Sequence, residues 1–173
     1  MGADALTQVL SKRKPKTRRG KKILKDREPK VTEDAKTAMI IRGTKTSNDM
    51  SILLRELHLI RSPLAMIYMR KHEEHPFEES HKVEKMCTKF DHSLFVFGSS
   101  SKKRPARLIF GRLFDGGLLD MQEFNVEDYK SMQQFRASKE AMVGSKPLMV
   151  FQGPAFDSDE RMKRAPALDR IGG

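Results

Sequence analysis

Residues 93–115 read Ser-Leu-Phe-Val-Phe-Gly-Ser-Ser-Ser-Lys-Lys-Arg-Pro-Ala-Arg-Leu-Ile-Phe-Gly-Arg-Leu-Phe-Asp, so that two apolar runs flank a cationic loop. The runs 94–97 and 108–114 are rich in Phe, Leu, Val and Ile, as buried strands are. An Asp-Gly-Gly sequence at 115–117 supplies the next turn. The segment therefore predicts paired strands joined by an exposed loop. That loop presents three consecutive cations, Lys102, Lys103 and Arg104.

The cationic loop has two interpretations. Cations held between two ordered strands suit a phosphate backbone, because neutralising phosphates releases condensed counterions and gives sequence-independent affinity. An ordinary hairpin tip carries the same residues, since surface Lys and Arg usually serve only for solvation. This segment alone favours neither interpretation.

The charge of the whole chain favours a nucleic-acid partner. The 173 residues include 34 Lys and Arg against 23 Asp and Glu, a net charge of +11. Residues 1–30 hold eleven of these cations and three carboxylates. Within them, 12–25 has few apolar residues, which predicts a disordered basic arm. RNA contact and nuclear import are both expected of such an arm, in preference to solubility alone.

The pattern of apolar residues predicts an α/β fold, an α+β mixed sheet with helices packed on it. The expected order is β-α-β-α-β-β-β-α-β. Strands are expected at 37–42, 64–69, 94–97, 108–114, 118–124 and 148–151, and helices at 48–61, 79–90 and 125–138. Cys87 is the sole cysteine and shares helical spacing with Val83, Met86 and Phe90, so we expect it in the core.

Length and hydropathy restrict the class of protein further. Without the arm, the chain has material for one modest domain. It contains no apolar run of 18 residues and no apolar segment of the kind that a secretory signal needs, so we expect an intracellular protein. A single cysteine excludes an internal disulfide and a thiolate zinc site.

Four segments carry a resemblance to a known family: 40–47, 75–78, 93–105 and 111–116. They resemble the Brix-domain ribosome assembly factors, from about residue 30 to residue 157. The resemblance implies a protein of the nucleus and nucleolus that takes part in maturation of large-subunit rRNA. It also implies a set of partners: 5S and large-subunit rRNA, regulator of ribosome synthesis one, the large-subunit proteins that accompany 5S rRNA, and the pre-60S particle.

The chain departs from the family pattern near its end. Brix domains resemble two similar α/β halves, and only the first half is complete here, with 148–156 resembling the opening strand of the second. Pro166 and the scarcity of apolar residues oppose a helix at 163–173. We therefore expect a basic arm at 1–30, the first Brix half at 31–157 and a poorly structured tail at 158–173, as in a truncated product.

The candidate RNA contacts share a positive charge and lie in the arm, the hairpin or the first strand and its loop. They are Lys12, Arg13, Lys14, Lys16, Arg18, Arg19, Lys21, Lys22, Arg42, Lys45, Lys102, Lys103, Arg104, Arg107 and Arg112. The loop at 43–47 lies between a strand and a helix, where backbone amides and Lys45 are expected to hold a phosphate.

No catalytic arrangement emerges from the sequence. His72 and His75 lack the spacing of a zincin motif, Gly43-Thr44-Lys45-Thr46 lacks the upstream glycine of a Walker loop, and no nucleophile–base set can be assembled. We expect a non-catalytic scaffold with no metal and no cofactor. Two alternatives remain: a protein–protein adaptor without direct RNA contact, and a truncated product without function.

Overall fold

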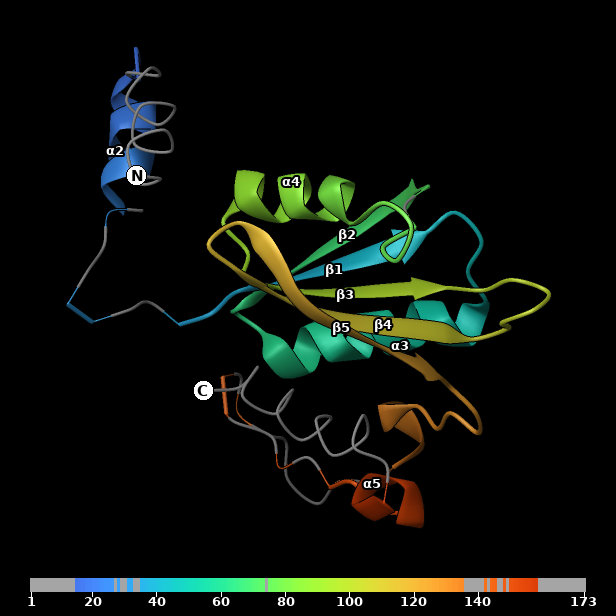
Figure 1. Ribbon diagram of the computed structural model, residues 1–173. Helices are drawn as coiled ribbons and strands as arrows, with labels where there is room; N and C mark the ends of the chain where they lie inside the picture. The colour runs from blue at the N-terminus through green and yellow to red at the C-terminus, as the bar shows by residue number, and fades with distance from the viewer. Residues whose placement is uncertain are drawn as a thin grey trace. The chain divides into compact units, whose positions relative to one another are not determined.

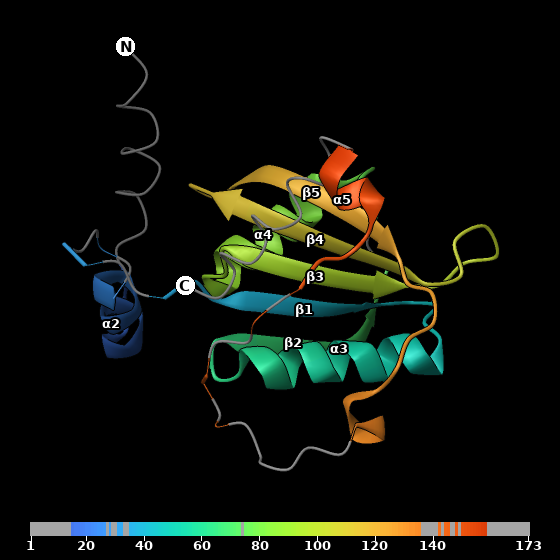
Figure 2. The same ribbon diagram turned by 90° about the horizontal axis from the view of Figure 1, so that it is seen from below.

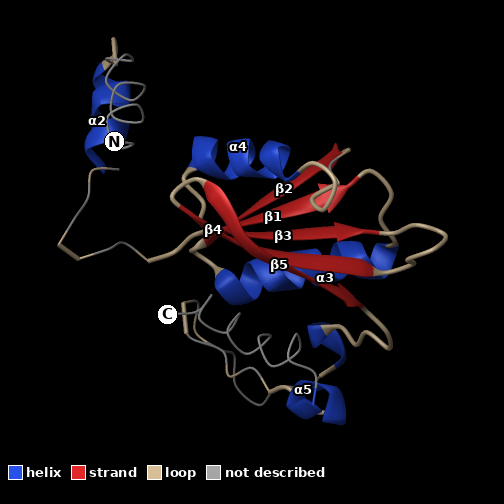
Figure 3. Ribbon diagram, in the orientation of Figure 1, coloured by secondary structure: helices blue, strands red, loops and turns tan. Residues whose placement is uncertain are grey.

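The computed structural model describes residues 15–26, 28, 31–32, 35–73, 75–135, 142, 144–145, 148 and 150–158. The chain divides into two units, Met1–Asp34 and Ala35–Gly173. The second unit contains a five-stranded mixed sheet with helices on it (Figures 1 and 3), which confirms the predicted fold class. Its main elements are β1 (Ala38–Gly43), α3 (Asn48–Arg61), β2 (Ala65–His72), α4 (Ser80–Phe90), β3 (Leu94–Ser99), β4 (Arg107–Phe114) and β5 (Gly117–Asn125).

The strand order β2-β1-β3-β4-β5 explains the placement of the two long helices. β1 pairs in parallel with both β2 and β3, whereas β4 and β5 continue as an antiparallel meander. The chain moves outward from β1 to β2 through α3 and back to β3 through α4. Because parallel crossovers are right-handed, this reversal places the helices on opposite faces of the sheet (Figures 1 and 2).

Each face of the sheet carries its own apolar core, because alternate residues of a strand point to opposite sides. Under α3 the buried side chains are Ala38, Ile40, Met50, Leu54, Ala65, Leu94, Val96 and Leu108. Under α4 they are Met39, Ile41, Val83, Cys87, Phe95, Phe97, Ile109 and Leu113. The central strands β1 and β3 are buried on both faces, which is why their sequences are almost continuously apolar.

Cys87 lies in the core, as its helical spacing predicts. Its side chain is fully buried, and this burial raises the pKa of the thiol to about 12. The group therefore stays a neutral thiol, which packs as a small apolar side chain.

The predicted helix at 125–138 is wrong for the part of it that the structure describes. A 3-10 turn, η1 (Met132–Gln134), is the helical structure present there, preceded by an irregular segment with a bend at Asp128. Glu56 of α3, whose side chain is buried, explains the difference. Its carboxylate accepts hydrogen bonds from the Tyr129 hydroxyl, from Ser131 Oγ at 2.6 Å and from the Met132 amide at 2.9 Å. These contacts hold the segment against α3.

The three donors also control the charge of Glu56. Burial raises the pKa of this carboxyl, but the hydrogen bonds from Ser131, Tyr129 and Met132 together outweigh it, so the pKa is lowered. We expect Glu56→Gln to destabilise the protein by about 1–3 kcal/mol, because donors arranged for a carboxylate are left poorly satisfied. Denaturant unfolding measures this loss, and the exposed Glu78→Gln is its control. Faster amide exchange confined to 126–135 is the second expected result, and unchanged exchange there would contradict it.

The predicted last strand, 148–151, is also absent from the residues that the structure describes. Leu148, Val150 and Phe151 have no strand structure, and a short helix, α5 (Pro154–Ser158), follows them. The rings of Phe151 and Phe156 pack together with centroids 5.4 Å apart. Of the predicted tail, 159–173 lies outside the described residues.

His92 is a buried polar side chain at the start of β3. Thr37 Oγ1 donates to the Asp91 carbonyl at 2.8 Å, so its 2.9 Å contact with His92 Nδ1 requires the ring to donate there. Nε2 then carries a lone pair, which has no partner among the described residues. Burial lowers the pKa of His92 below its ordinary value of 6.5, although the neighbouring Asp91 raises it in part.

The lowered pKa of His92 predicts that the protein becomes less stable in acid. The unfolded chain binds a proton near pH 6.5 and the folded chain only at lower pH, so the free energy of unfolding decreases as pH falls below 6.5. His92→Gln should remove this pH dependence of the free energy of unfolding, whereas a substitution of the exposed His81, His81→Gln, should leave it unchanged. Denaturation midpoints between pH 5 and 8 provide the measurement. If wild type and His92→Gln have parallel pH profiles, the assignment is wrong.

The first unit contains a helix, α2 (Arg18–Asp26), within the segment for which the sequence predicts a disordered basic arm. Thr17 begins the helix, because its Oγ1 accepts a hydrogen bond from the Gly20 amide at 3.1 Å. The helix consists largely of Arg, Lys, Ile and Leu, which tolerate helical backbone well. Among the described residues no helix is long and apolar enough to cross a bilayer.

Candidate nucleic-acid interface

The candidate site lies at the edge of the sheet where β1, β2 and β3 end. Because the three strands are parallel, their carboxyl ends meet there, and the register places Arg42 opposite both Lys71 and Gly98. β4 begins at the same edge, with Arg107 opposite Ser99. The connections from β1 and β3 leave in opposite directions at this point, which is where ligands bind in many open α/β sheets.

Two loops at this edge are tied to each other. The Ser100 amide donates to the Lys45 carbonyl at 2.7 Å, and the Ser47 amide donates to Ser100 Oγ at 3.0 Å. The β3–β4 loop, which projects beyond the sheet in Figure 1, is closed by a turn in which the Ser101 amide donates to the Arg104 carbonyl at 2.8 Å. Lys45, Lys102 and Lys103 are thus carried on loops anchored to strand ends.

Most cations at this edge form no ion pair within the part of the chain that the structure describes. Lys45, Lys71, Lys102 and Lys103 are exposed and form no ion pair with another described residue. Arg42 is half-buried, and its Nε has no acceptor among the described residues. Arg107 donates from Nε to Ser99 Oγ at 3.3 Å. We call this group the basic edge: Arg42, Lys45, Lys71, Lys102, Lys103 and Arg107.

Lys71 was not among the sequence candidates. It lies near the end of β2, and the β-α-β pattern already implied that β2 runs parallel to β1 and ends at the same edge. The missing information was the strand order, because only adjacency to β1 places Lys71 beside Arg42. The signal that would have identified Lys71 is therefore a predicted strand that follows a crossover helix and ends in basic residues.

Two predicted contacts are neutralised by carboxylates. Arg104 Nη1 lies 2.7 Å from both carboxylate oxygens of Glu123, and Arg112 pairs with Asp120, with 2.8 Å from Nε to Oδ1. The hydrogen bond and charge of Asp120 raise the pKa of Arg112, although partial burial opposes this. Arg112 pairs across the sheet with Leu94, at the start of β3, so the structure does not bring it to the basic edge.

The arm candidates lie in the first unit. Arg18, Arg19, Lys21 and Lys22 belong to α2, and Lys16 lies two residues before it, whereas Lys12, Arg13 and Lys14 lie outside the described residues. At 3.6 residues per turn, the helical cations share one side and Ile23 and Leu24 the other. α2 is therefore an amphipathic helix with one basic face.

The start of α3 is less suited to a phosphate than the sequence predicts. Ser47 caps the helix by accepting from the Met50 amide at 3.2 Å, and the Ser47 amide is occupied by Ser100. Asp49 adds a negative charge in the first turn. Lys45 remains available in this loop, but part of the backbone that was expected to hold an anion is already hydrogen-bonded.

The sequence of the chain matches a known protein family. The family model of the Brix domain matches residues 43–168, from the end of β1 past α5. The chain belongs to the Brix-domain family, as the resemblance in its sequence predicts. The match extends past residue 157, where the sequence had suggested a departure from the family pattern.

The chain is similar to proteins named Ribosome production factor 2 homolog. It is 40% identical to the one of Mus musculus over 165 residues, which are 95% of this chain and 53% of that protein. It is 38% identical to that of Homo sapiens over the same shares. With that of Schizosaccharomyces pombe it shares 37% identity over 92% of this chain and 50% of the relative. The chain thus spans about half the length of these relatives.

Proposed function

We propose that this chain is a non-catalytic ribosome assembly factor that binds ribosomal RNA through its basic edge. The observation that carries the proposal is the gathering, where β1, β2 and β3 end, of four exposed lysines that form no ion pair with another described residue. Loops tied to strand ends anchor the backbones of Lys45, Lys102 and Lys103, and β2 anchors that of Lys71, so little backbone entropy is lost when phosphates bind these side chains. The names of the relatives support a role in ribosome production.

The proposal also concerns the binding partners of the chain and its location in the cell. We infer that the chain contacts 5S and large-subunit rRNA and helps to recruit the 5S ribonucleoprotein particle to the pre-60S particle. In that role it acts with regulator of ribosome synthesis one and the proteins that accompany 5S rRNA, in the nucleolus. The basic face of α2 supports a second RNA contact or an import signal, since such segments commonly serve both.

The mode of binding follows from the kind of groups present. Lysines on loops meet phosphates as point charges and read little sequence, so affinity depends on RNA shape and salt. Among the described residues no group of three or more His, Cys, Asp and Glu is arranged to hold a metal. The basic edge offers cations and backbone groups and no nucleophile–base pair, which supports a binding role and not a catalytic one.

Binding to isolated RNA tests the proposal against the adaptor alternative. Fluorescence anisotropy of the full chain with 5S rRNA and with large-subunit rRNA fragments, at several salt concentrations, is expected to show affinity that decreases linearly on a log–log plot. Absence of binding at low salt would support the protein–protein adaptor. Thermal unfolding of the same sample, with one cooperative transition, excludes a failure to fold as the reason.

A further inference from the structure

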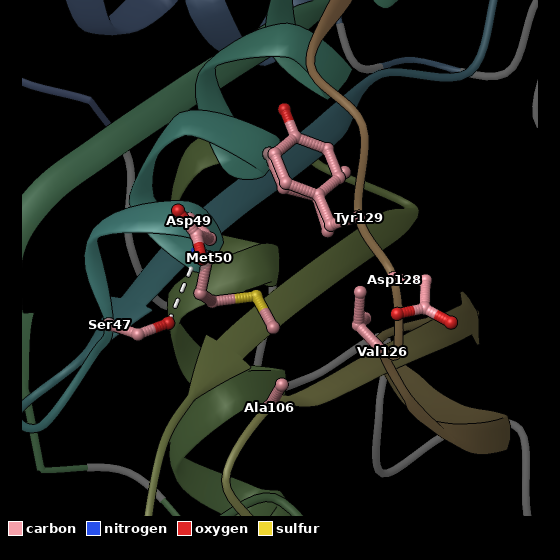
Figure 4. A pocket seen from close by; sticks show the side chains of 8 residues that line it. Ser47, Asp49, Met50, Ala106, Val126, Asp128 and Tyr129 are labelled. Carbon is pink, nitrogen blue, oxygen red and sulfur yellow. Dashed lines mark hydrogen bonds between the residues drawn. The ribbon is translucent and has the colours of Figure 1, made fainter.

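A small pocket opens beside the basic edge, between the start of α3, the end of the β3–β4 loop and the segment that follows β5. Its volume is about 130 Å³. Met50, Leu53 and Val126 give it an apolar wall, together with the ring of Tyr129 (Figure 4). Asp49 and Asp128 bring carboxylates to it from two different segments, α3 and the chain after β5.

The wall of the pocket is held in place by contacts already described. Met50 is buried in the α3 core, and its amide is fixed by the Ser47 cap. The Tyr129 hydroxyl donates to Glu56 and points away from the pocket, so the side of the ring faces it (Figure 4). Burial and the Glu56 carboxylate, with a smaller contribution from Asp49, raise the pKa of Tyr129 to about 12, so the ring stays neutral. The pocket is therefore formed before any ligand arrives.

The charge of the pocket is opposite to that of its surroundings. Asp49 and Asp128 are exposed, and neither accepts a hydrogen bond or forms an ion pair with another described residue. In a chain with a net charge of +11, two unpaired carboxylates beside an apolar wall select against phosphate and for a cation. This pocket therefore does not extend the RNA site.

We propose that the pocket binds an arginine side chain presented by an extended basic segment of a protein partner. The aliphatic stem fits against Met50 and Val126, beside the Tyr129 ring. The several N–H donors of the planar guanidinium then reach both carboxylates, which the compact ammonium of lysine cannot match. A hydrated divalent ion needs about six oxygen ligands, and an apolar wall does not supply them.

Binding of this kind goes beyond the RNA contact that we propose for the basic edge. Ala106 lines the pocket and also ends the β3–β4 loop that carries Lys102 and Lys103. A basic protein segment and an RNA strand would therefore lie side by side on one edge of the sheet. The negative pocket would fix the protein segment at a place where lysines otherwise repel it.

Titration of the ¹⁵N-labelled full chain with N-acetyl-arginine methylamide tests the pocket without RNA. Saturable amide shifts at 47–53, 106 and 126–129 are expected, with weaker shifts for the lysine analogue and none for the isosteric, neutral citrulline analogue. Asp128→Asn and Asp49→Asn should each weaken binding about tenfold, since each removes one charge-assisted hydrogen bond. The matched control is Glu127→Gln, one residue away, which should leave binding unchanged.

A variant that fills the pocket tests whether arginine binding depends on the shape of the pocket as well as on its charge. Ala106→Met keeps both carboxylates and should abolish the arginine shifts, and the amide spectrum reports whether it and the Asp variants remain folded. Equal shifts with arginine and citrulline, or arginine binding that survives both Asp49→Asn and Ala106→Met, would overturn the proposal. Tighter binding of Mg²⁺ alone than of the arginine analogue at these amides would assign the pocket to a metal instead.

Discussion

Replacing the four exposed lysines of the basic edge is expected to remove most of the RNA affinity of the folded unit. The substitutions are Lys45→Gln, Lys71→Gln, Lys102→Gln and Lys103→Gln. Each cation that neutralises a phosphate contributes about 0.7–0.9 to the slope of log affinity against log salt, so the slope should decrease by about three. Because the counterion contribution vanishes at about 1 M salt, a change of this size corresponds to a loss of affinity on the order of 1,000-fold at 0.1 M salt. Anisotropy titrations at four or more salt concentrations measure both quantities.

A second quadruple variant controls for net charge. Lys36→Gln, Arg55→Gln, Lys85→Gln and Lys130→Gln remove the same charge from exposed residues that are not part of the basic edge. A general attraction between a basic protein and RNA would weaken equally in both variants. If RNA contacts the basic edge specifically, the salt slope of the control variant should stay within about one unit of the wild-type slope. Equal losses of affinity in the two quadruple variants would refute specific contacts at the basic edge.

Gly111→Ala is expected to cost about 3 kcal/mol, near the upper end for an overpacked core. Gly111 lies opposite Phe95 in the β3–β4 ladder, and an added Cβ would lie 2.2 Å and 2.3 Å from two atoms of the Phe95 ring. Phe95 is 1% exposed and packed among side chains under α4, so its ring cannot move away without opening that core. Denaturant unfolding of the full chain measures the loss.

Two further variants identify the cause. Gly117→Ala in the same meander is the matched control, because its added Cβ would make only an ordinary contact, 3.7 Å from the Phe114 carbonyl oxygen. Adding Phe95→Leu to Gly111→Ala should recover part of the lost stability, since the smaller side chain leaves room for the methyl group. No recovery in the double variant would show that the strain lies elsewhere.

Much of the sheet and both long helices could be predicted from local patterns. β1 and β3 are continuous apolar runs, and α3 shows its apolar period together with a Ser47 cap and a Ser62-Pro63 end. These signals depend on neighbours within a few residues, which the sequence displays directly. The predicted bounds therefore lie within a few residues of those observed for β1 through β5, α3 and α4.

The errors concern features that depend on residues far apart in the chain. Tyr129 and Met132 have helical spacing, but Glu56, more than seventy residues earlier, fixes their segment in another conformation. Arg104 and Arg112 appear as free cations in the sequence until the register brings Glu123 and Asp120 to them. Lys71 joins the basic edge only through the strand order. Charge alone therefore located the cationic loop but not the other residues that lie at the basic edge.

Photochemical crosslinking of the full chain to rRNA, followed by mass spectrometry of the crosslinked peptides, tests most directly whether the basic edge is where RNA binds. Our account predicts crosslinks in the segments 42–47, 71–73 and 99–107, which decrease as salt is raised. Crosslinks confined to residues 1–30, with none in the sheet, would contradict it, because the ordered lysines at the ends of β1, β2 and β3 would then carry no RNA.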